Sequence, residues 1–279
     1  MKKGKKPTSF GRLAILGGGN IGQAIARGLV QSGRCSARDI TVTRRQEGLL
    51  AGLAKEGFVV EADNRDAVRR SDVLILAVQP QQLVSLLEEI RGEVSPKKHL
   101  LVSIVSGVRS SDILRHLRRE VPVVRAMPNT AIAIRESMTC LASESAPKEA
   151  LEVARSIFDT VGKTLVITED LMIPATALCA CGIAFFLRCI RAASQGGIEI
   201  GFHSDEALLM AAQTAKGAAS LILSGEHHPE PEIDKVTTPR GCTIAGLNEM
   251  EHQGFSSAMI KGIVTSADKA GKLFVPERG

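Results

Sequence analysis

The stretch 13–29, LAILGGGNIGQAIARGL, constrains the fold of this chain more than any other. Its apolar start predicts a strand buried on both faces, and its end has the periodicity of a helix, with a glycine turn between them. The turn matches the pattern G-x-G-x-x-G at Gly17, Gly19 and Gly22. These glycines allow a tight turn, the approach of a pyrophosphate, and close packing of helix on strand. The phosphates would bind the N–H groups of Asn20 and Ile21, so the stretch predicts a dinucleotide site, with a purely structural turn as the alternative.

The end of the second predicted strand, residues 39–43, indicates which dinucleotide would bind. In NAD-binding folds an acidic residue at this place bonds the ribose 2′-hydroxyl. This chain has Thr43, Arg44 and Arg45 there, and we expect no carboxylate nearby. Two guanidinium groups and a hydroxyl suit a 2′-phosphate, so NADP is predicted, with NAD as the less favoured cofactor. An exposed basic turn is the alternative interpretation.

Further apolar runs predict strands at 59–60, 73–78, 100–105 and 121–126, and helical patterns separate most of them. This alternation predicts a doubly wound parallel sheet of the Rossmann type. Ligands in such sheets bind at the carboxyl ends of the strands. The residues expected to meet there are the glycine turn, Arg44, Gln79, Pro80, Ser106, Gly107 and Asn129.

Strand signals stop after about Thr168, and two long helical runs follow at 174–195 and 204–223. We therefore predict a dinucleotide-binding domain over 1–168 and an all-helical dimerisation and substrate domain over 169–279. The small, apolar faces of these helices are too extensive to be buried within one chain, which predicts at least a homodimer.

Composition excludes several classes of function. Four of the charges behind the net +5 are Lys2, Lys3, Lys5 and Lys6, and without them the net charge is +1. Because the chain also has no Trp or Tyr to stack on bases, we expect no nucleic-acid partner. No apolar run approaches the roughly 18 residues that span a bilayer, so we expect no membrane association and a cytoplasmic location.

The six cysteines lack a C-x-x-C pair and histidines at ligand spacing, and they are expected to be reduced. His227 and His228 stand in a polar stretch before Pro229, which favours solvent exposure over metal binding. We therefore predict no metal site.

The chain resembles the pyrroline-5-carboxylate reductase family over nearly its whole length. The residues that carry the resemblance are GGGNIGQAIARGL, AVQPQQ at 77–82, VRAMPNT at 124–130, EDL at 169–171 and the signature VTTPRGCTIAGL at 236–247. The resemblance implies NADPH-dependent reduction of the cyclic imine 1-pyrroline-5-carboxylate to L-proline, the last step of proline biosynthesis. It also implies a Rossmann domain, a helical dimerisation domain, and substrate bound between them across the dimer.

The same resemblance implies which residues bind the cofactor and which bind the substrate. Asn64 would contact the adenosine ribose, and Ala77, Val78, Gln79, Pro80 and Ser106 would line the cofactor site. Glu169, Thr238, Gly241, Cys242 and Thr243 would bind the substrate. The chain departs from the family pattern at Gln79, usually Lys, at 179–184 (CACGIA in place of SGSGPA) and at Arg240, usually Gly. The last two changes fall near the expected substrate pocket and bear on which substrate is used.

The signature also has a physical interpretation of its own. Pro239 and Gly241 interrupt one helix and Thr243 begins the next, so the N–H groups of 241–243 offer a carboxylate site. The Thr243 hydroxyl could bond a ring nitrogen and is the predicted catalytic group, while a simple helix cap is the alternative. Carbonyl reduction is disfavoured, because the chain has no Tyr and no Lys between Lys163 and Lys216. A reductase of a related cyclic imine, or a non-catalytic NADP-binding regulatory protein, remains an alternative.

Overall fold

The computed structural model describes residues 10–225 and 228–272 of the chain. The described residues divide into two compact units, one containing 10–180 and 266–272, the other containing 181–225 and 228–265. The predicted division between 168 and 169 stays a prediction. Lys2, Lys3, Lys5, Lys6 and His227 lie outside the described residues.

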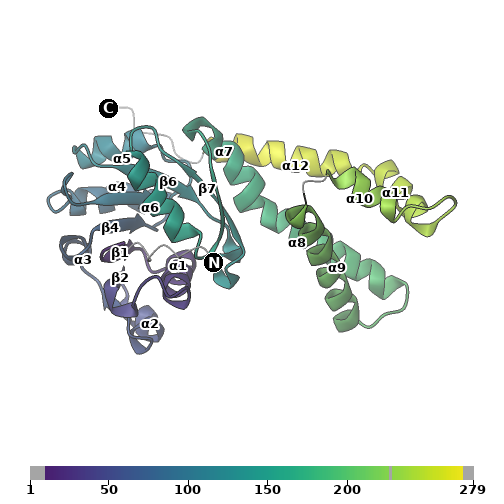
Figure 1. Ribbon diagram of the computed structural model, residues 1–279, viewed down its shortest axis with the longest axis horizontal. Helices are drawn as coiled ribbons and strands as arrows, with labels where there is room; N and C mark the ends of the chain where they lie inside the picture. Colours follow the sequence, from purple (N-terminus) through teal and green to yellow (C-terminus); the bar gives the residue numbers. More distant parts are fainter. Residues whose placement is uncertain (1–9, 226–227, 273–279) are drawn as a thin grey trace, which may run out of the picture. The chain divides into compact units, whose positions relative to one another are not determined.

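The first unit is built on a sheet of eight strands in the order β3-β2-β1-β4-β5-β6-β7-β8 (Figure 1). The strands are β1 Leu13–Leu16, β2 Ile40–Thr43, β3 Val59–Glu61, β4 Val73–Leu76, β5 Leu100–Ser103, β6 Val123–Met127, β7 Ser137–Ala142 and β8 Gly162–Val166. Neighbouring strands run parallel except β6 and β7, which are antiparallel. The order 3-2-1-4-5-6 is that of a doubly wound dinucleotide-binding sheet, so the predicted fold class is confirmed.

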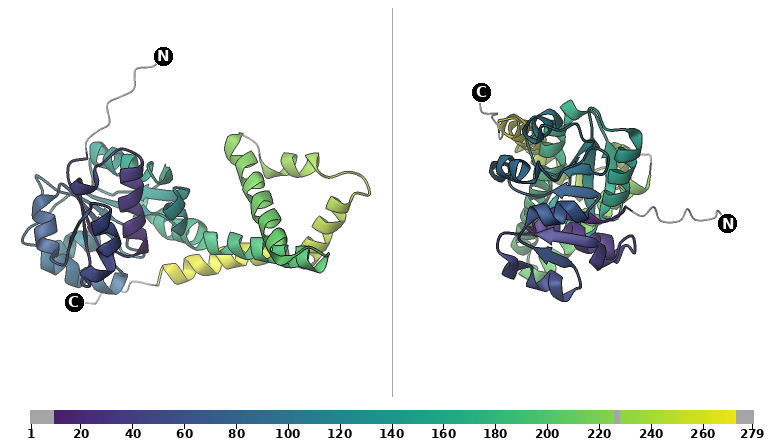
Figure 2. Two further views of the ribbon diagram at one scale, coloured as in Figure 1. Left: turned by 90° about the horizontal axis from the view of Figure 1, so that it is seen from below. Right: turned by 90° about the vertical axis from the view of Figure 1, so that its left-hand side faces the viewer.

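Helices cover both faces of this sheet (Figures 1 and 2). In the first unit they are α1 Asn20–Gln31, α2 Ala51–Lys55, α3 Asn64–Arg70, α4 Pro80–Ile90, α5 Ser110–Leu117, α6 Lys148–Phe158 and α7 Met172–Ala175. Short 3-10 helices add η1 Ala37–Asp39, η2 Glu47–Leu50, η3 Thr130–Ile134 and η4 Glu169–Leu171, and a π-helical turn, η5, spans Thr176–Cys181.

Side chains of the central strands point alternately into two hydrophobic layers. Leu13 and Ile15 of β1 pack in the layer that contains Phe158 of α6, whereas Ala14 and Leu16 pack in the opposite layer with α4 and α5. All four β1 side chains are fully buried. Burial of each large aliphatic side chain contributes roughly 1.5–3 kcal/mol, which explains why a run of four apolar residues predicts a central strand.

Two strands, β7 and β8, are additional to the six predicted from the sequence. β7 (SMTCLA) contains polar Ser137 and Thr139, yet both are buried. β8 (GKTLV) leaves Leu165 and Val166 about half exposed. Because neither strand has a continuous apolar run or a clean alternation, their strand character depends on pairing with β6 and with each other.

The second unit is helical, with α8 Gly182–Glu199, α9 Ser204–Ser224, α10 Pro229–Lys235, α11 Cys242–His252 and the greater part of α12 Phe255–Ala270. α8 and α9 pack against each other, with Gly197 close to Ala207, where an added Cβ would approach the alanine Cβ to 2.9 Å. Only Gly182, Ser194 and Ala207 are buried in these two helices.

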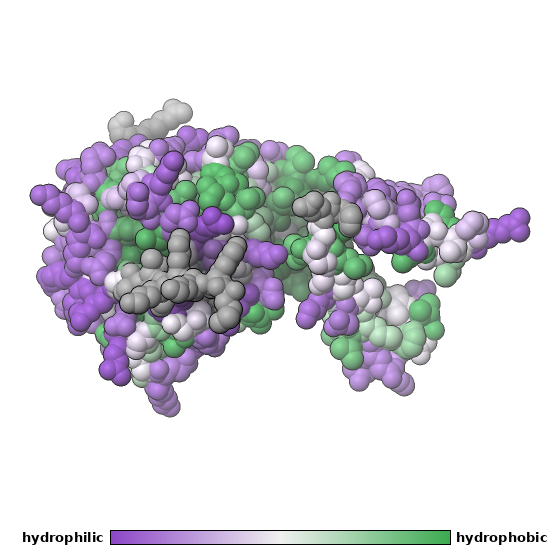
Figure 3. Space-filling view, viewed as in Figure 1, coloured by the Kyte–Doolittle hydropathy of each residue, from purple (hydrophilic) through white to green (hydrophobic). Residues whose placement is uncertain are grey.

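Two helical segments, Glu169–Glu199 and Ser204–Ser224, are long and apolar enough to cross a membrane by length and composition. The expectation that no run approaches this length is therefore wrong. In these segments Ala, Gly and Cys stand between the larger apolar residues, and charged residues are few, so the mean hydropathy stays high although no long run of large apolar residues is present. Large apolar side chains are exposed along them, among them Phe186, Leu187 and Leu209. Figure 3 shows hydrophobic residues, in green, at the surface of the helical part of the molecule.

Candidate cofactor and substrate sites

A cavity of about 430 Å³ lies at the carboxyl ends of β1, β2 and β4. Its walls come from the glycine turn, the residues after β2, the start of α3, the β4–α4 connection and one face of α4. The lining residues are Gly17, Gly18, Gly19, Thr43, Arg44, Arg45, Gln46, Asn64, Ala77, Val78, Gln79, Gln82, Leu86 and Glu89. The volume suits part of a dinucleotide in an open cleft.

Two glycines of the motif, Gly17 and Gly22, are required by their surroundings. Gly17 has φ +120°, and a Cβ there would overlap the carbonyl of Ala77. A Cβ at Gly22 would overlap the carbonyl of Gly17, so helix and strand approach as closely as the motif requires. A Cβ at Gly19 would meet nothing within 4 Å, and this glycine begins α1 without a side-chain cap. The cradle therefore has room for a phosphate at a helix N-terminus.

The two arginines after β2 differ in their contacts. Arg44 is half-buried, and its Nη1 donates a hydrogen bond to the carbonyl of Gly18 at 2.9 Å. Arg45 lines the cavity, is exposed, and makes no hydrogen bond or ion pair within the part of the chain that the structure describes. Arg44 therefore stabilises the glycine turn, whereas the guanidinium of Arg45 can bind an anionic group of a ligand.

A carboxylate also faces this cavity, contrary to the expectation of none nearby. Glu89 of α4 accepts hydrogen bonds from Nδ2 of Asn64 at 3.1 Å on both oxygens. Oδ1 of Asn64 in turn accepts a hydrogen bond from the Thr43 hydroxyl at 2.6 Å. Glu89 follows Arg45 by more than forty residues in the sequence, and it lines the same cavity only because α4 packs on the sheet.

Other predicted cofactor residues are distributed around this region. Ala77, Val78 and Gln79 line the cavity. The remaining ones do not line it: Asn20, Ile21, Gly22, Pro80, Ser106 and Asn129. Asn20 lines a second cavity of about 190 Å³, and Pro80 is the first residue of α4. The cofactor roles of all these residues stay predictions.

Glu169 forms a buried ion pair with Arg125 of β6, with a distance of 3.3 Å between Nη1 and Oε1 and both side chains at least 94% buried. The same carboxylate accepts from the backbone N–H and the hydroxyl of Ser110, at 2.8 and 2.9 Å. Desolvation lowers the pKa of Arg125 and the neighbouring Glu169 opposes that shift. Because three hydrogen bonds already occupy this carboxylate, the geometry gives it a role in positioning η4 and α5. A direct substrate contact stays a prediction.

Two cysteine thiols, Cys140 of β7 and Cys179 of η5, lie 3.9 Å apart. The hydrogen bond between the two thiols lowers the pKa of Cys179, and burial opposes this shift. Asn129 anchors the same turn, since its Nδ2 donates to the carbonyl of Cys179 at 3.3 Å.

The signature segment lies in the second unit. Gly241, not Thr243, is the N-cap of α11, so Thr243 is not a helix cap, and no side chain caps the first N–H groups. The N–H of Gly241 donates to the carbonyl of Thr238 at 2.9 Å. Arg240 is exposed with φ +61°, a left-handed conformation that explains why glycine suits this position. The local geometry is compatible with a carboxylate at the start of α11, which Cys242 and Thr243 begin.

Three cavity residues that sequence reasoning did not identify come from α4: Gln82, Leu86 and Glu89. They are spaced i, i+4, i+7, so a helical projection beginning at the AVQPQQ turn could have placed them on one face. Among the described residues there is no group of three or more metal-ligating side chains.

Comparisons with known proteins agree with these features. Residues 169–273 match the model of the pyrroline-5-carboxylate reductase dimerisation family, and residues 12–107 match the family described as NADP oxidoreductase coenzyme F420-dependent.

The chain is 54% identical over 278 residues to pyrroline-5-carboxylate reductase 1 of Dictyostelium discoideum, covering 95% of this chain but 50% of that protein, and so spans half the relative's length. It is 49% identical to pyrroline-5-carboxylate reductase 2 of the same organism, covering 93% and 92% of the two chains. A solved pyrroline-5-carboxylate reductase from Coxiella burnetii is similar with a TM-score of 0.89 at 29% identity, covering 95% and 99%.

Proposed function

Because the chain belongs to the pyrroline-5-carboxylate reductase family, we propose that it reduces 1-pyrroline-5-carboxylate to L-proline with NADPH, the last step of proline biosynthesis. The predicted family is confirmed. The observation that carries the proposed activity is the cavity at the glycine turn, where a helix N-terminus without a side-chain cap and the free guanidinium of Arg45 lie beside one cleft. A dinucleotide with a 2′-phosphate is the ligand whose charges match both.

NADPH would supply a hydride to the imine carbon, C2 of 1-pyrroline-5-carboxylate, and a proton on the ring nitrogen completes the amine. An iminium already carries that proton, or water supplies it, so no strong acid is required of the protein. The chain's own contribution is then orientation. The N–H groups of Cys242 and Thr243 at the start of α11 would hold the substrate carboxylate, with Thr238 beside them, and the Thr243 hydroxyl would hold the ring nitrogen. The N–H of Gly241, also expected to bind the carboxylate, is instead bonded to the carbonyl of Thr238, so Gly241 would shape the turn.

Arg240 is proposed to contact the carboxylate of the substrate. Its long side chain is exposed beside the start of α11, so a guanidinium contact to the substrate carboxylate fits its chemistry. Arg240→Gly should then raise KM. If Arg240 instead obstructs the pocket, the same change would improve turnover. The substitution also relieves a left-handed non-glycine conformation, which costs about 1 kcal/mol, so a small rise in Tm should accompany it.

Self-association follows from the dimerisation family, and a homodimer is the assembly proposed. The large apolar side chains exposed on α8 and α9 support it, since Leu209 is 70% and Phe186 is 62% exposed. A second copy of the chain would cover these faces. The two helices of membrane length would then be apolar because they pack in a dimer, which agrees with the proposed cytoplasmic location. Light scattering at micromolar concentration tests this, and a monomeric mass would contradict it.

The test of the function is NADPH oxidation on addition of pyrroline-5-carboxylate, with its six-membered analogue alongside. Turnover of the five-membered ring supports the proposal, while preference for the six-membered ring would assign a related cyclic imine. A protein that binds NADPH but oxidises none with either substrate would instead be a non-catalytic binding protein.

A further inference from the structure

Glu89 contributes to a hydrogen-bonded chain of side chains along the wall of the cofactor cavity. The Thr43 hydroxyl donates to Oδ1 of Asn64 at 2.6 Å, and Nδ2 of Asn64 donates to both oxygens of Glu89 at 3.1 Å. All three residues line the cavity. They come from β2, α3 and α4, so this relay, Thr43–Asn64–Glu89, joins three elements at one edge of the sheet.

The direction of the relay is set by the carboxylate. An ionised carboxylate only accepts hydrogen bonds, so the amide nitrogen of Asn64 must face Glu89 and its oxygen must face Thr43. Thr43 can donate or accept, and therefore it does not select an orientation by itself. Without Glu89, the Asn64 amide could turn over and present different atoms to the cavity.

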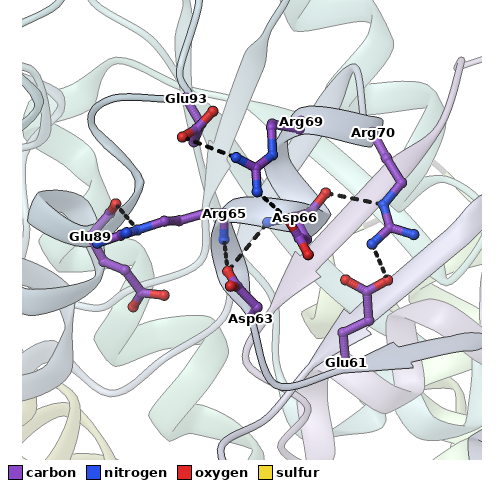
Figure 4. A network of polar contacts seen from close by, with 8 residues as sticks. All are labelled: Glu61, Asp63, Arg65, Asp66, Arg69, Arg70, Glu89 and Glu93. Atoms are coloured by element: carbon purple, nitrogen blue, oxygen red, sulfur yellow. Dashed lines mark hydrogen bonds and ion pairs between the residues drawn. The ribbon is translucent and has the colours of Figure 1, made fainter.

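Other contacts hold the helices together, so the carboxylate of Glu89 is not needed for that purpose. Nε of Arg65 donates to the backbone carbonyl of Glu89 at 3.1 Å, and Arg69 pairs with Glu93 at 3.4 Å (Figure 4). Asp63 caps α3 by accepting from the backbone N–H of Arg65 at 2.7 Å. These contacts use backbone atoms and residues that do not line the cavity.

We propose that Glu89 is a positioning residue for the cofactor: its carboxylate fixes the orientation of the Asn64 amide, and with it the hydrogen-bonding atoms presented to the adenosine half of NADPH. This rests on the proposed use of NADPH. Glu89 also offers acceptor capacity on the cavity side, because a carboxylate has about four lone-pair sites and Asn64 occupies only part of them.

The test measures Kd of the full chain for NADPH and for 2′,5′-ADP, which carries the adenosine half alone, by calorimetry. Glu89→Ala should raise both values by roughly 5- to 20-fold, because the amide loses its fixed orientation. Asn64→Asp should weaken binding at least as much, since two carboxylates would then face each other. Glu89→Gln alone should also raise Kd, by about 3- to 10-fold, because its amide can donate as well as accept and so no longer selects the orientation of Asn64, whereas a merely structural hydrogen bond would survive this change.

The decisive variant combines Asn64→Asp with Glu89→Gln. Here the amide introduced at position 89 donates to the carboxylate introduced at position 64, while the Thr43 hydroxyl still donates to the other oxygen of that carboxylate, which rebuilds the relay in reverse. The charge of the pair is also that of the unchanged protein. Affinity should nevertheless stay as low as in Asn64→Asp, because position 64 then presents only acceptors to the cofactor, whereas a merely structural role of the pair would be rescued by this exchange.

Glu93→Ala is the matched control, because it removes an arginine partner of the same helix pair without touching the cavity. It should leave both Kd values unchanged. Normal affinity of Glu89→Ala, or a double variant whose affinity is restored to that of the unchanged protein, would overturn this proposal while leaving the proposed cofactor in place. If the unchanged protein binds neither ligand, the proposed cofactor fails and this proposal with it.

Discussion

Arg45→Ala should remove the preference for NADPH, whereas Arg44→Ala should weaken NADPH and NADH alike. The guanidinium of Arg44 is engaged with the carbonyl of Gly18 at 2.9 Å and so shapes the turn that receives the phosphates of either cofactor. Arg45 is exposed on the cavity wall, and only a ligand with a 2′-phosphate would give it a charged partner there.

A hydrogen bond to a charged group is worth about 1.5–3 kcal/mol, or roughly 10- to 150-fold in binding. Because Arg45 is exposed, solvent screening places its contribution near the lower end, about 10- to 30-fold. The KM for NADPH should rise by that factor in Arg45→Ala, while the KM for NADH should change by less than about 2-fold. For Arg44→Ala, a distorted turn should cost about 3- to 10-fold with both cofactors.

The assay is kcat/KM for each cofactor at saturating pyrroline-5-carboxylate, in the unchanged protein and the two variants. Arg45→Lys is the matched control, since it keeps the charge and should retain part of the preference. Equal affinity for NADH and NADPH in the unchanged protein would refute the assignment of the 2′-phosphate site. A preference lost in Arg44→Ala but kept in Arg45→Ala would reverse the roles deduced from the hydrogen bond to Gly18.

Glu169→Ala should lower the free energy of unfolding in urea by about 3–5 kcal/mol, because it leaves Arg125 buried without its counter-ion; a loss below about 1 kcal/mol would contradict this. Thr243→Val should reduce kcat/KM about 10- to 150-fold with NADPH affinity unchanged, and an unaffected kcat/KM would exclude the hydroxyl from the reaction. Alkylation of Cys179 should begin at a lower pH than that of an ordinary thiol, and its pH profile should move to higher pH in Cys140→Ala, since the Cys140 thiol stabilises the Cys179 thiolate; identical pH profiles would argue against the hydrogen bond.

Much of the first unit could be predicted from the sequence, because the controlling patterns are local. β1, the turn at Gly17 and α1 are specified by adjacent residues: a buried apolar run, a glycine whose φ is +120°, and a helical periodicity. The alternation of such units also determines the parallel sheet. By contrast, β7 and β8 lack a local strand pattern, and their pairing at the sheet edge makes them strands.

Site details depended on contacts between distant residues. Sequence alone placed Arg44 and Arg45 beside the cofactor as equivalent charges, but packing binds one to the glycine turn and leaves the other exposed. It gave no reason to join Glu89 to Asn64, or Glu169 to Arg125, across 25 and 44 residues. Residue types and short spacings determine which elements form and where ligands can bind. Which side chains satisfy one another is decided only when helices and strands pack, because hydrogen bonds and ion pairs act over a few ångströms in space, whatever the separation along the chain.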